Sequence, residues 1–560
     1  MTAHELDAAP PREDPSRRGS PLHAVALPRG RLARSLTLGL LLSGCFFLAL
    51  GPRLAGLDTY GTSDEGFWIQ RTLRFGAALA QRQHRRTYRT GHPGVTVMWV
   101  GLLGVGPQRL EPFIPIRYSP FLVLQRRPGY LEVLSAARQA IVVATAALTV
   151  LIIVLAWKLV GAGPAAVGGL LLLFDPYLVG MLRVLHVDAL LTPLMTVSAL
   201  AGLIYWRQGR RPAYLALSAV AGGLALLTKA PAAYLPIYLG MVGLLAARPW
   251  RTGWRGLLPT IVWGLIAAGV YGALWPALWV DPIGRLQQVA AFALSVGGNP
   301  HRWPNYFMGQ AMLGDPGPFY YPVALAYRLS PIVLFGLLAL LLVRRRQGPI
   351  VPSLLLLAYV VPFIALMTLA PKKFDRYMLP VIPILVLLAG VGLWTLSRKL
   401  ATIPRAVALV VPIGMQITLL WQSYPYPIAF YNPLLGGAAG AERAIIVGWG
   451  EGLEQTAGYL DQLPGAERLA VSTNYHHVLR PLFRGATAPI REPTRLDYFV
   501  VYVNMAQRGL IPPAVEQAMS EGPPEFTAIV NEVEYAWVYR VSGIVQQRPE
   551  VPPDADEEQG

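Results

Sequence analysis

Cysteine is almost absent from this chain of 560 residues, in which Cys45 is the single example. One cysteine excludes an intrachain disulfide and a metal site built from several cysteines. The residues before it, Leu42-Ser43-Gly44, resemble the cleavage site of a bacterial lipoprotein signal. However, the apolar run continues past Cys45 to Leu50, and a long polar segment precedes it. We therefore interpret this run as a membrane span rather than a cleaved signal.

Charged residues are also scarce. They make up 14% of the chain, compared with roughly a quarter in soluble proteins, whereas hydrophobic residues make up 54%. Apolar runs long enough to cross a bilayer recur between Leu36 and Leu420. The sequence thus predicts an all-α polytopic membrane protein. We expect about eleven transmembrane helices, near residues 36–52, 134–157, 163–181, 188–206, 213–228, 231–247, 257–279, 330–343, 350–370, 380–396 and 406–422.

Acidic residues are fewer than basic ones, 31 against 48, which gives a formal net charge of +17. Outside the span borders no basic run is interleaved with aromatic residues, so the expected partner is the lipid bilayer and not nucleic acid. The Lys and Arg clusters of the short loops follow the positive-inside rule. They predict a plasma-membrane protein with a cytoplasmic N-terminus. The loops 53–133 and 281–328, and everything after Tyr424, are then extracytoplasmic.

The composition changes after the last predicted span. Residues 424–545 predict a small extracytoplasmic α/β domain, and the segments 1–30 and 546–560 predict disordered tails. Within the domain we expect strands at 444–447, 469–472 and 498–503, a helix over 451–463, and a strand pair within 526–541. The run Gly448-Trp449-Gly450-Glu451-Gly452 lacks the third glycine of a dinucleotide-binding loop, so we interpret it as a plain strand-to-helix turn.

Under this topology, ionisable residues gather on the extracytoplasmic side, and such residues at the edge of a membrane mark candidate sites. They fall into four groups along the chain, and Lys229 at the outer end of the fifth predicted span is a further candidate. The groups contain the pair Asp64-Glu65, then His92, then Arg183, His186 and Asp188, and finally Lys372 and Arg376.

Acids beside clustered cations suit the handling of an anionic, lipid-linked substrate. Arg and Lys would stabilise a phosphate leaving group, with Arg376, Lys372, Lys229, Arg183, His186, Asp188 and His92 as the candidate donor-binding residues. An incoming hydroxyl needs a base within hydrogen-bond reach. We predict Asp64 as that base and Glu65 as its catalytic partner, in an inverting displacement. No metal or other cofactor is expected, although a divalent cation stays open.

Each candidate also has a purely structural interpretation. Asp64 and Glu65 could cap the following helix, and His186 and Asp188 could cap the fourth span. Lys229 and Lys372 could reach toward lipid head groups, and His92 could be a turn residue. The segment 66–83 could be an interfacial helix or a solvated loop helix.

Several of these segments resemble a known family of enzymes. SDEGFW (63–68) followed by GHPGVTVMW (91–99) resembles the first extracytoplasmic loop of protein O-mannosyltransferases, where an Asp-Glu pair precedes a His-Pro-Pro motif. The segments 183–201, 223–232 and 371–393 are similar to further parts of the same clan, which includes the aminoarabinose transferases and glycosyltransferase family 39/83. The resemblance covers residues 36 to 422, with Gly94 in place of the second proline.

The resemblance implies a membrane fold of the GT-C type and a polyprenyl-phosphate-linked sugar as donor. It implies an inverting glycosyltransferase with Asp64 as catalytic base, a mannose-like hexose as the favoured sugar, and a protein, lipid or polysaccharide as acceptor. Two other functions stay open on the sequence. One is a flippase or secondary transporter of a lipid-linked or anionic substrate, and the other is a membrane anchor for a C-terminal binding domain.

Overall fold

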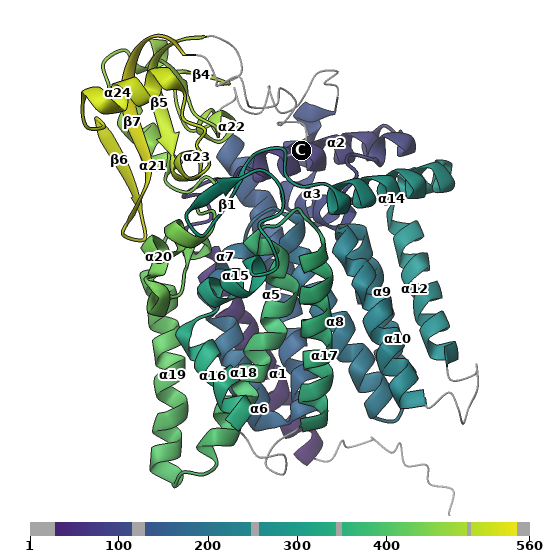
Figure 1. Ribbon diagram of the computed structural model, residues 1–560. Coiled ribbons are helices and arrows are strands. Elements are labelled where there is room, and N and C mark those ends of the chain that lie inside the picture. Colours follow the sequence, from purple (N-terminus) through teal and green to yellow (C-terminus); the bar gives the residue numbers. More distant parts are fainter. Residues whose placement is uncertain (1–28, 115–128, 248–256, 343–349, 490–493, 546–560) are drawn as a thin grey trace, which may run out of the picture. The chain divides into compact units, whose positions relative to one another are not determined.

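The computed structural model describes residues 29–114, 129–247, 257–342, 350–489 and 494–545 (Figure 1). The predicted tail 546–560 and most of the tail 1–30 lie outside these ranges. The chain divides into two compact units, Met1–Cys45 and Phe46–Gly560. The described part of the first unit is the beginning of helix α1 (Arg29–Leu54). The second unit contains the rest of α1 and all the later helices and strands.

Every predicted span coincides with an apolar helix. Within the described ranges, six helices are long and apolar enough to cross a membrane, or seven if a pair bent by 113° counts as one span. These six candidate spans are formed by α1, α5 (Tyr130–Val160), α8 (Val187–Arg207), α17 (Ile350–Leu369), α18 (Ile382–Ser397) and α19 (Thr402–Gln422). The bent pair joins α15 (Tyr320–Arg328) to α16 (Pro331–Leu342), and the shorter apolar helices include α6 (Ala162–Leu173), α9 (Pro212–Thr228), α10 (Tyr234–Ala247) and α12 (Leu258–Leu274).

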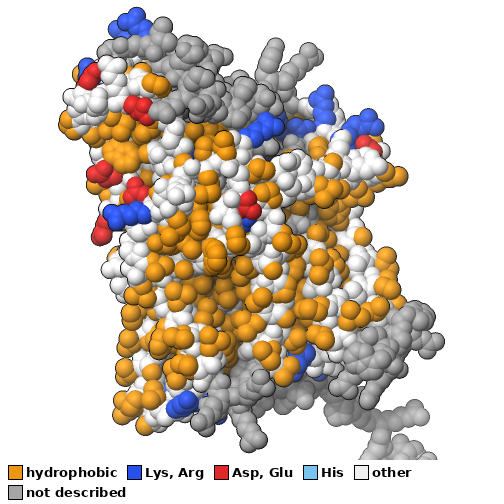
Figure 2. All heavy atoms as spheres, in the orientation of Figure 1, with side chains coloured by type: hydrophobic (Ala, Val, Ile, Leu, Met, Phe, Trp, Pro, Cys, Tyr) orange, Lys and Arg blue, Asp and Glu red, His pale blue; other side chains and the backbone are white. Residues whose placement is uncertain are grey.

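Burial separates the central helices from the peripheral ones. The spanning part of α8 is wholly buried and that of α18 nearly so, whereas α19 exposes most of its surface. Figure 2 shows hydrophobic side chains covering the long helices on one face, with charged side chains concentrated toward the two ends. This distribution is typical of a multi-pass membrane protein. In such a protein the exposed apolar side chains lie in the lipid core, and the charged side chains lie at the two membrane–water interfaces.

Two predicted spans are each broken into two helices. The span 163–181 divides into α6 and α7 (Pro176–Met181), and the span 257–279 divides into α12 and α13 (Pro276–Val280). At the first break the Asp175 side chain accepts a hydrogen bond from the Leu178 N–H at 2.9 Å. At both breaks a proline is the first residue of the new helix, where its missing N–H costs no helical hydrogen bond. Only the first break also has a capping carboxylate.

The loop predicted at 53–133 contains two packed helices, α2 (Glu65–Ala80) and α3 (Val95–Leu110). Helix α2 buries ten of its residues, including Trp68 and Leu73, so it is not a solvated loop helix. It packs against α3, an apolar helix that the sequence prediction missed. In the loop 281–328, α14 (Pro282–Gly298) and the hairpin β1 (Asn305–Phe307) and β2 (Gln310–Met312) were also not predicted. Figure 1 shows α2 and α14 running across the ends of the long helices.

The C-terminal part contains the predicted small α/β domain. Its mixed sheet has the strand order β4-β3-β5-β7-β6, parallel from β4 to β5 and antiparallel from β5 to β6. The helices that accompany the sheet are short. The strands are β3 (Ala470–Ser472), β4 (Ala486–Ala488), β5 (Thr494–Tyr502), β6 (Phe526–Val530) and β7 (Val533–Val545), and the helices are α20 (Gly437–Ala444), α21 (Leu453–Leu460), α22 (His476–Leu479), α23 (Val503–Gln507) and α24 (Pro513–Glu521).

The strand predicted at 444–447 is wrong. Residue Ala444 ends α20, and Ile445 forms only an isolated bridge with Phe307 of β1. The Gln507 side chain occupies the place of a neighbouring strand, because it accepts a hydrogen bond from the Val447 N–H and donates one to the Ile445 carbonyl. A side chain distant in sequence therefore satisfies a backbone that local pattern alone assigns to a sheet.

The turn after this segment packs directly on the loop before α2. The Ser63 N–H donates to the Trp449 carbonyl at 2.8 Å. Gly450 has φ +122°, and a Cβ placed there would lie 2.7 Å from the Gly61 carbonyl oxygen. Only glycine fits this close backbone approach without strain. The C-terminal domain and the loop before α2 are thus joined backbone to backbone.

We expect Gly450→Ala to lower the free energy of unfolding by roughly 1–3 kcal/mol, because it adds both backbone strain and a steric clash. Thermal unfolding of the purified protein in detergent measures the change. Gly458→Ala in α21 is the matched control, since a Cβ there meets no atom within 4 Å. It should be neutral or stabilising by up to about 1 kcal/mol. Equal unfolding temperatures for the two variants would contradict the contact.

Candidate functional site

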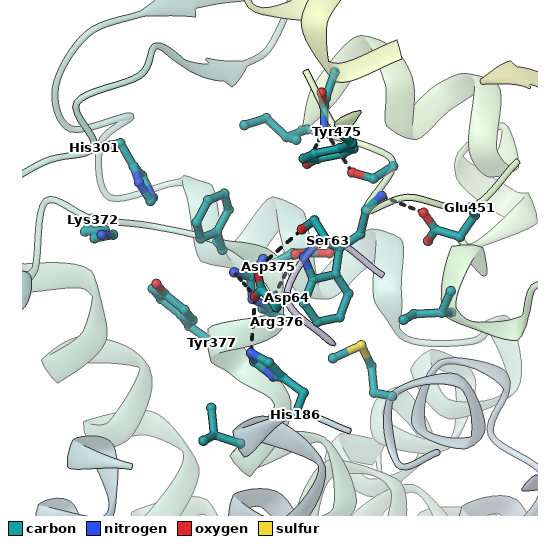
Figure 3. Close-up of a pocket in the computed structure, with 18 of the residues that line it drawn as sticks. Ser63, Asp64, His186, His301, Lys372, Asp375, Arg376, Tyr377, Glu451 and Tyr475 are labelled. Atoms are coloured by element: carbon teal, nitrogen blue, oxygen red, sulfur yellow. Dashed lines mark hydrogen bonds and ion pairs between the residues drawn. The ribbon is translucent and has the colours of Figure 1, made fainter. Parts of the chain in front are cut away.

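A polar cavity lies where the loop before α2, one set of helix ends and the C-terminal domain meet (Figure 3). Segments far apart in sequence contribute to it. Its lining includes Ser63, Asp64, Arg71, His92, His186, Lys229, His301, Arg302, Lys372, Phe374, Asp375, Arg376, Tyr377, Trp449, Glu451, Tyr475, Asn504 and Arg508. The structure therefore brings Asp64, the first of the two predicted N-terminal acids, into the same cavity as the predicted cationic loop.

Asp64 occupies the N-cap position of α2, but its side chain makes no capping hydrogen bond. Its Oδ2 atom lies 3.2 Å from His186 Nε2 and 3.4 Å from Arg376 Nη2. Burial favours a raised pKa, but the His186 hydrogen bond and the Arg376 charge hold the pKa of Asp64 below its usual range. Asp64 is therefore an ionised carboxylate that faces the cavity.

Asp188 is the second carboxylate of the site, at the start of α8. Its Oδ1 accepts from Lys229 Nζ at 2.8 Å, and its Oδ2 lies 3.4 Å from His186 Nδ1. Lys229 ends α9, is buried, and has its ammonium 4.7 Å from the centre of the Tyr377 ring. It is thus paired within the protein and does not extend toward lipid. His186 also accepts from the Asp188 N–H at 3.2 Å, so the capping interpretation of this pair is correct as well.

Arg376 is held by aromatic rings from two parts of the chain. Its guanidinium lies 4.4 Å from the centre of the Phe374 ring and 4.8 Å from that of Trp449, which belongs to the C-terminal domain. The preceding residue, Asp375, accepts from Arg328 Nε at 2.6 Å and fixes the turn. Arg376 therefore presents its charge to Asp64 from a rigid position (Figure 3).

Glu65 does not line the cavity, so its predicted catalytic role is not supported by its position. Its side chain is fully buried, and both oxygens bind Arg138, with Nε at 2.7 Å from Oε1. Oε1 also accepts from the Leu185 N–H, and Oε2 from the Thr62 N–H and hydroxyl. A carboxylate with every oxygen satisfied anchors the loop before Asp64 and has no free lone pair for substrate.

Arg183 is likewise outside the cavity lining. It is buried and donates to the Gly56 carbonyl, so it supports the first loop and does not face a donor phosphate. His92 and Lys372 do line the cavity. The His92 ring lies 4.8 Å from the centre of the Phe292 ring, and burial together with the Lys229 charge holds its pKa well below the usual range, which leaves the imidazole neutral.

The sequence analysis missed the part of the cavity contributed by the loop 281–328 and the C-terminal domain. His301 and Arg302 come from the former, and Trp449, Tyr475 and Arg508 from the latter. The glycine-rich run 448–452 was the available signal, because three of its five residues are glycines around an aromatic and an acid. Within the described ranges, no three His, Cys, Asp or Glu side chains are grouped to hold a metal ion, and metal independence stays a prediction.

The site can be compared with known proteins at this point. Residues 129–275 match the family described as dolichyl-phosphate-mannose-protein mannosyltransferase, which confirms the resemblance noted in the sequence. A search of curated protein sequences gave no match.

Solved structures similar to the chain include two membrane glycosyltransferases. One is ArnT from Cupriavidus metallidurans bound to undecaprenyl phosphate, with 15% identity and a TM-score of 0.46 over 94% of this chain and 100% of that chain. Another is the oligosaccharyltransferase AglB from Archaeoglobus fulgidus in complex with an inhibitory peptide and a dolichol-phosphate. It has 11% identity and a TM-score of 0.41, over 86% of this chain and 70% of that chain.

The two adjacent acids should respond differently to neutralisation. We expect Glu65→Gln to cost roughly 3–5 kcal/mol of folding free energy, because it leaves Arg138 as an unpaired buried charge. Asp64→Asn should leave the unfolding temperature close to that of the wild type, since Asp64 is partly open to the cavity. Thermal unfolding monitored by tryptophan fluorescence measures both. A larger loss for Asp64→Asn than for Glu65→Gln would contradict these assignments.

Proposed function

We propose that this protein is a glycosyltransferase that moves a sugar from a polyprenyl-phosphate donor to an acceptor hydroxyl. The reaction takes place at the extracytoplasmic face of the plasma membrane and inverts the anomeric centre. The observation that carries the proposal is the contact between Asp64 and Arg376, 3.4 Å apart and inside one cavity. A candidate base and a candidate phosphate-binding cation share a single site, as the proposed reaction requires.

The donor phosphate is assigned to the cations around Arg376. Arg376 offers a planar guanidinium, and Lys229 and Lys372 line the same cavity. When the bond between the sugar and the phosphate breaks, polyprenyl phosphate leaves, and it is a good leaving group when cations stabilise its departing charge, so no general acid is needed. The cavity is lined in part by residues at the ends of apolar helices, such as Val187 of α8 and Lys229 at the end of α9, which supports a donor whose polyprenyl chain stays in lipid while its head group enters the site.

Asp64 is proposed as the base for the acceptor hydroxyl. In the structure its Oδ2 is engaged by His186 and Arg376, and these contacts weaken it as a base. A donor phosphate that draws Arg376 away would raise the pKa of Asp64 and free an oxygen for the hydroxyl proton. Donor binding would thus activate the base, and Asp188 would keep His186 and Lys229 in place.

The sugar is proposed to be a mannose-like hexose, on the strength of the family match over residues 129–275. The acceptor is a hydroxyl of a protein, lipid or polysaccharide. ArnT and AglB are described with undecaprenyl phosphate and dolichol-phosphate respectively, and such lipids are the donor carriers proposed for this chain.

Asp64→Asn should lower the rate of sugar transfer by roughly 10²–10⁴-fold, because it removes the base and keeps the shape of the side chain. The measurement is transfer from a panel of polyprenyl-phosphate hexoses by purified protein in liposomes, with release of polyprenyl phosphate as readout. Glu467→Gln, an exposed acid of the C-terminal domain, is the matched control and should retain full activity. Full transfer by Asp64→Asn would refute the proposed mechanism.

The pH profile provides an independent test of the base. His186 lowers the pKa of Asp64 by a hydrogen bond, so His186→Ala should raise that pKa. Protonation of Asp64 then begins at a higher pH, and the acid limb of the kcat/KM profile should move upward in pH. Activity near pH 8 should fall less than activity near pH 5. An acid limb that does not move would mean that Asp64 is not the titrating base.

A further inference from the structure

We infer that the cavity contains a second anion subsite, formed by Arg508 of the C-terminal domain with Lys372 and Arg302 of the extracytoplasmic loops. It would bind a phosphate or carboxylate other than the donor phosphodiester. The inference rests on the proposed function for the role of the first subsite, around Arg376 and Lys229. The ligand chemistry has two sources, the second phosphate of a lipid pyrophosphate or an anionic group on the acceptor.

Basic residues outnumber acidic ones in the lining of the cavity. Seven Lys and Arg residues line the cavity, but only three Asp and Glu residues do. Asp188, just behind the lining, adds one further acid through its contact with Lys229. A sugar phosphodiester carries a single negative charge. A buried cation needs a paired anion to offset its desolvation, so the test for a second anionic ligand is whether one of the buried cations lacks an acid.

Arg508 is the residue that points most directly to that ligand. It follows α23 at the C-cap and lines the cavity with only 9% of its surface exposed. Its Nε atom is buried without a hydrogen-bond partner. Within the described ranges, no Asp or Glu forms an ion pair with it. An arginine that is buried, unpaired and directed into a cavity is poised for a ligand that brings the missing negative charge.

The residues near Arg508 extend the same basic region. The positive charges of Lys372, Arg508 and Arg376 all act on His301, and burial together with these charges holds its pKa well below the usual range. His301 therefore stays neutral, and its Nε2 is buried without a partner. Figure 3 shows His301 and Lys372 on a side of the cavity away from His186. The basic groups thus continue beyond the Asp64 and Arg376 contact.

The test uses the full-length protein in nanodiscs saturated with undecaprenyl phosphate, which fills the first subsite. Binding of radiolabelled inorganic phosphate is then measured by equilibrium dialysis. We expect phosphate to bind in addition to the lipid. Arg508→Gln should weaken phosphate binding by roughly ten- to a hundredfold, through loss of a charged hydrogen-bond donor, and should leave lipid binding unchanged.

Two further variants keep the result interpretable. Arg302→Gln changes an exposed member of the subsite, so it should weaken phosphate binding without disturbing the fold. Arg468→Gln, an exposed arginine elsewhere in the same domain, is the matched control and should bind phosphate normally. The inference is overturned if the lipid-saturated protein binds no phosphate, or if Arg508→Gln and Arg302→Gln both behave like Arg468→Gln. Failure of undecaprenyl phosphate itself to bind would instead count against the proposed function.

Replacing the lipid distinguishes the two sources of the anion. If undecaprenyl pyrophosphate excludes inorganic phosphate and undecaprenyl phosphate does not, the subsite takes the second phosphate of the lipid. If phosphate binds in the presence of either lipid, the subsite takes an anionic group of the acceptor. Either outcome supports the subsite and assigns its ligand.

Discussion

The buried ion pair between Glu65 and Arg138 is the interaction on which the geometry of the site depends. It joins α2 to α5, and the same carboxylate accepts from the Leu185 N–H directly before His186. Asp64 and His186 are therefore both placed by one fully buried side chain. Removal of one partner from a buried ion pair strongly destabilises the fold. The two adjacent acids therefore have different roles. Glu65 fixes the loop, and Asp64 faces the cavity.

The C-terminal domain is part of the site and not an appended module. It belongs to the same compact unit as the helices that follow Cys45. Trp449 packs on Arg376, and His477 Nε2 lies 3.0 Å from the Ser63 carbonyl. The helices supply the candidate base and the cations near it, while the domain covers the cavity and adds Arg508. A function as a mere membrane anchor does not account for these contacts.

The sequence predicted those helices and motifs that can be identified from a short, continuous stretch of residues. Long apolar runs located the helices because a span must be apolar over its whole length, and the order of short motifs placed Asp64 and Arg376 on one side. The sequence did not predict the break at Asp175, where a carboxylate caps the helix that begins at Pro176, or the break at Trp275, where a helix begins at Pro276 without a side-chain cap.

The sequence also did not separate the roles of Asp64 and Glu65, since their difference comes from Arg138, a residue 73 positions away in sequence from Glu65. For the same reason the contribution of Arg508 was not visible, because it depends on how the C-terminal domain folds against the loops.

The contact between Gly450 and Gly61 has a consequence for biogenesis. The residues before α2 are synthesised early, whereas the turn that packs on them and the Asn504 to Arg508 segment emerge only near the end of translation. A nascent chain therefore holds an open, incomplete cavity until its last domain has been synthesised and folded. The cavity would be completed in a single late step, after every membrane helix is already inserted.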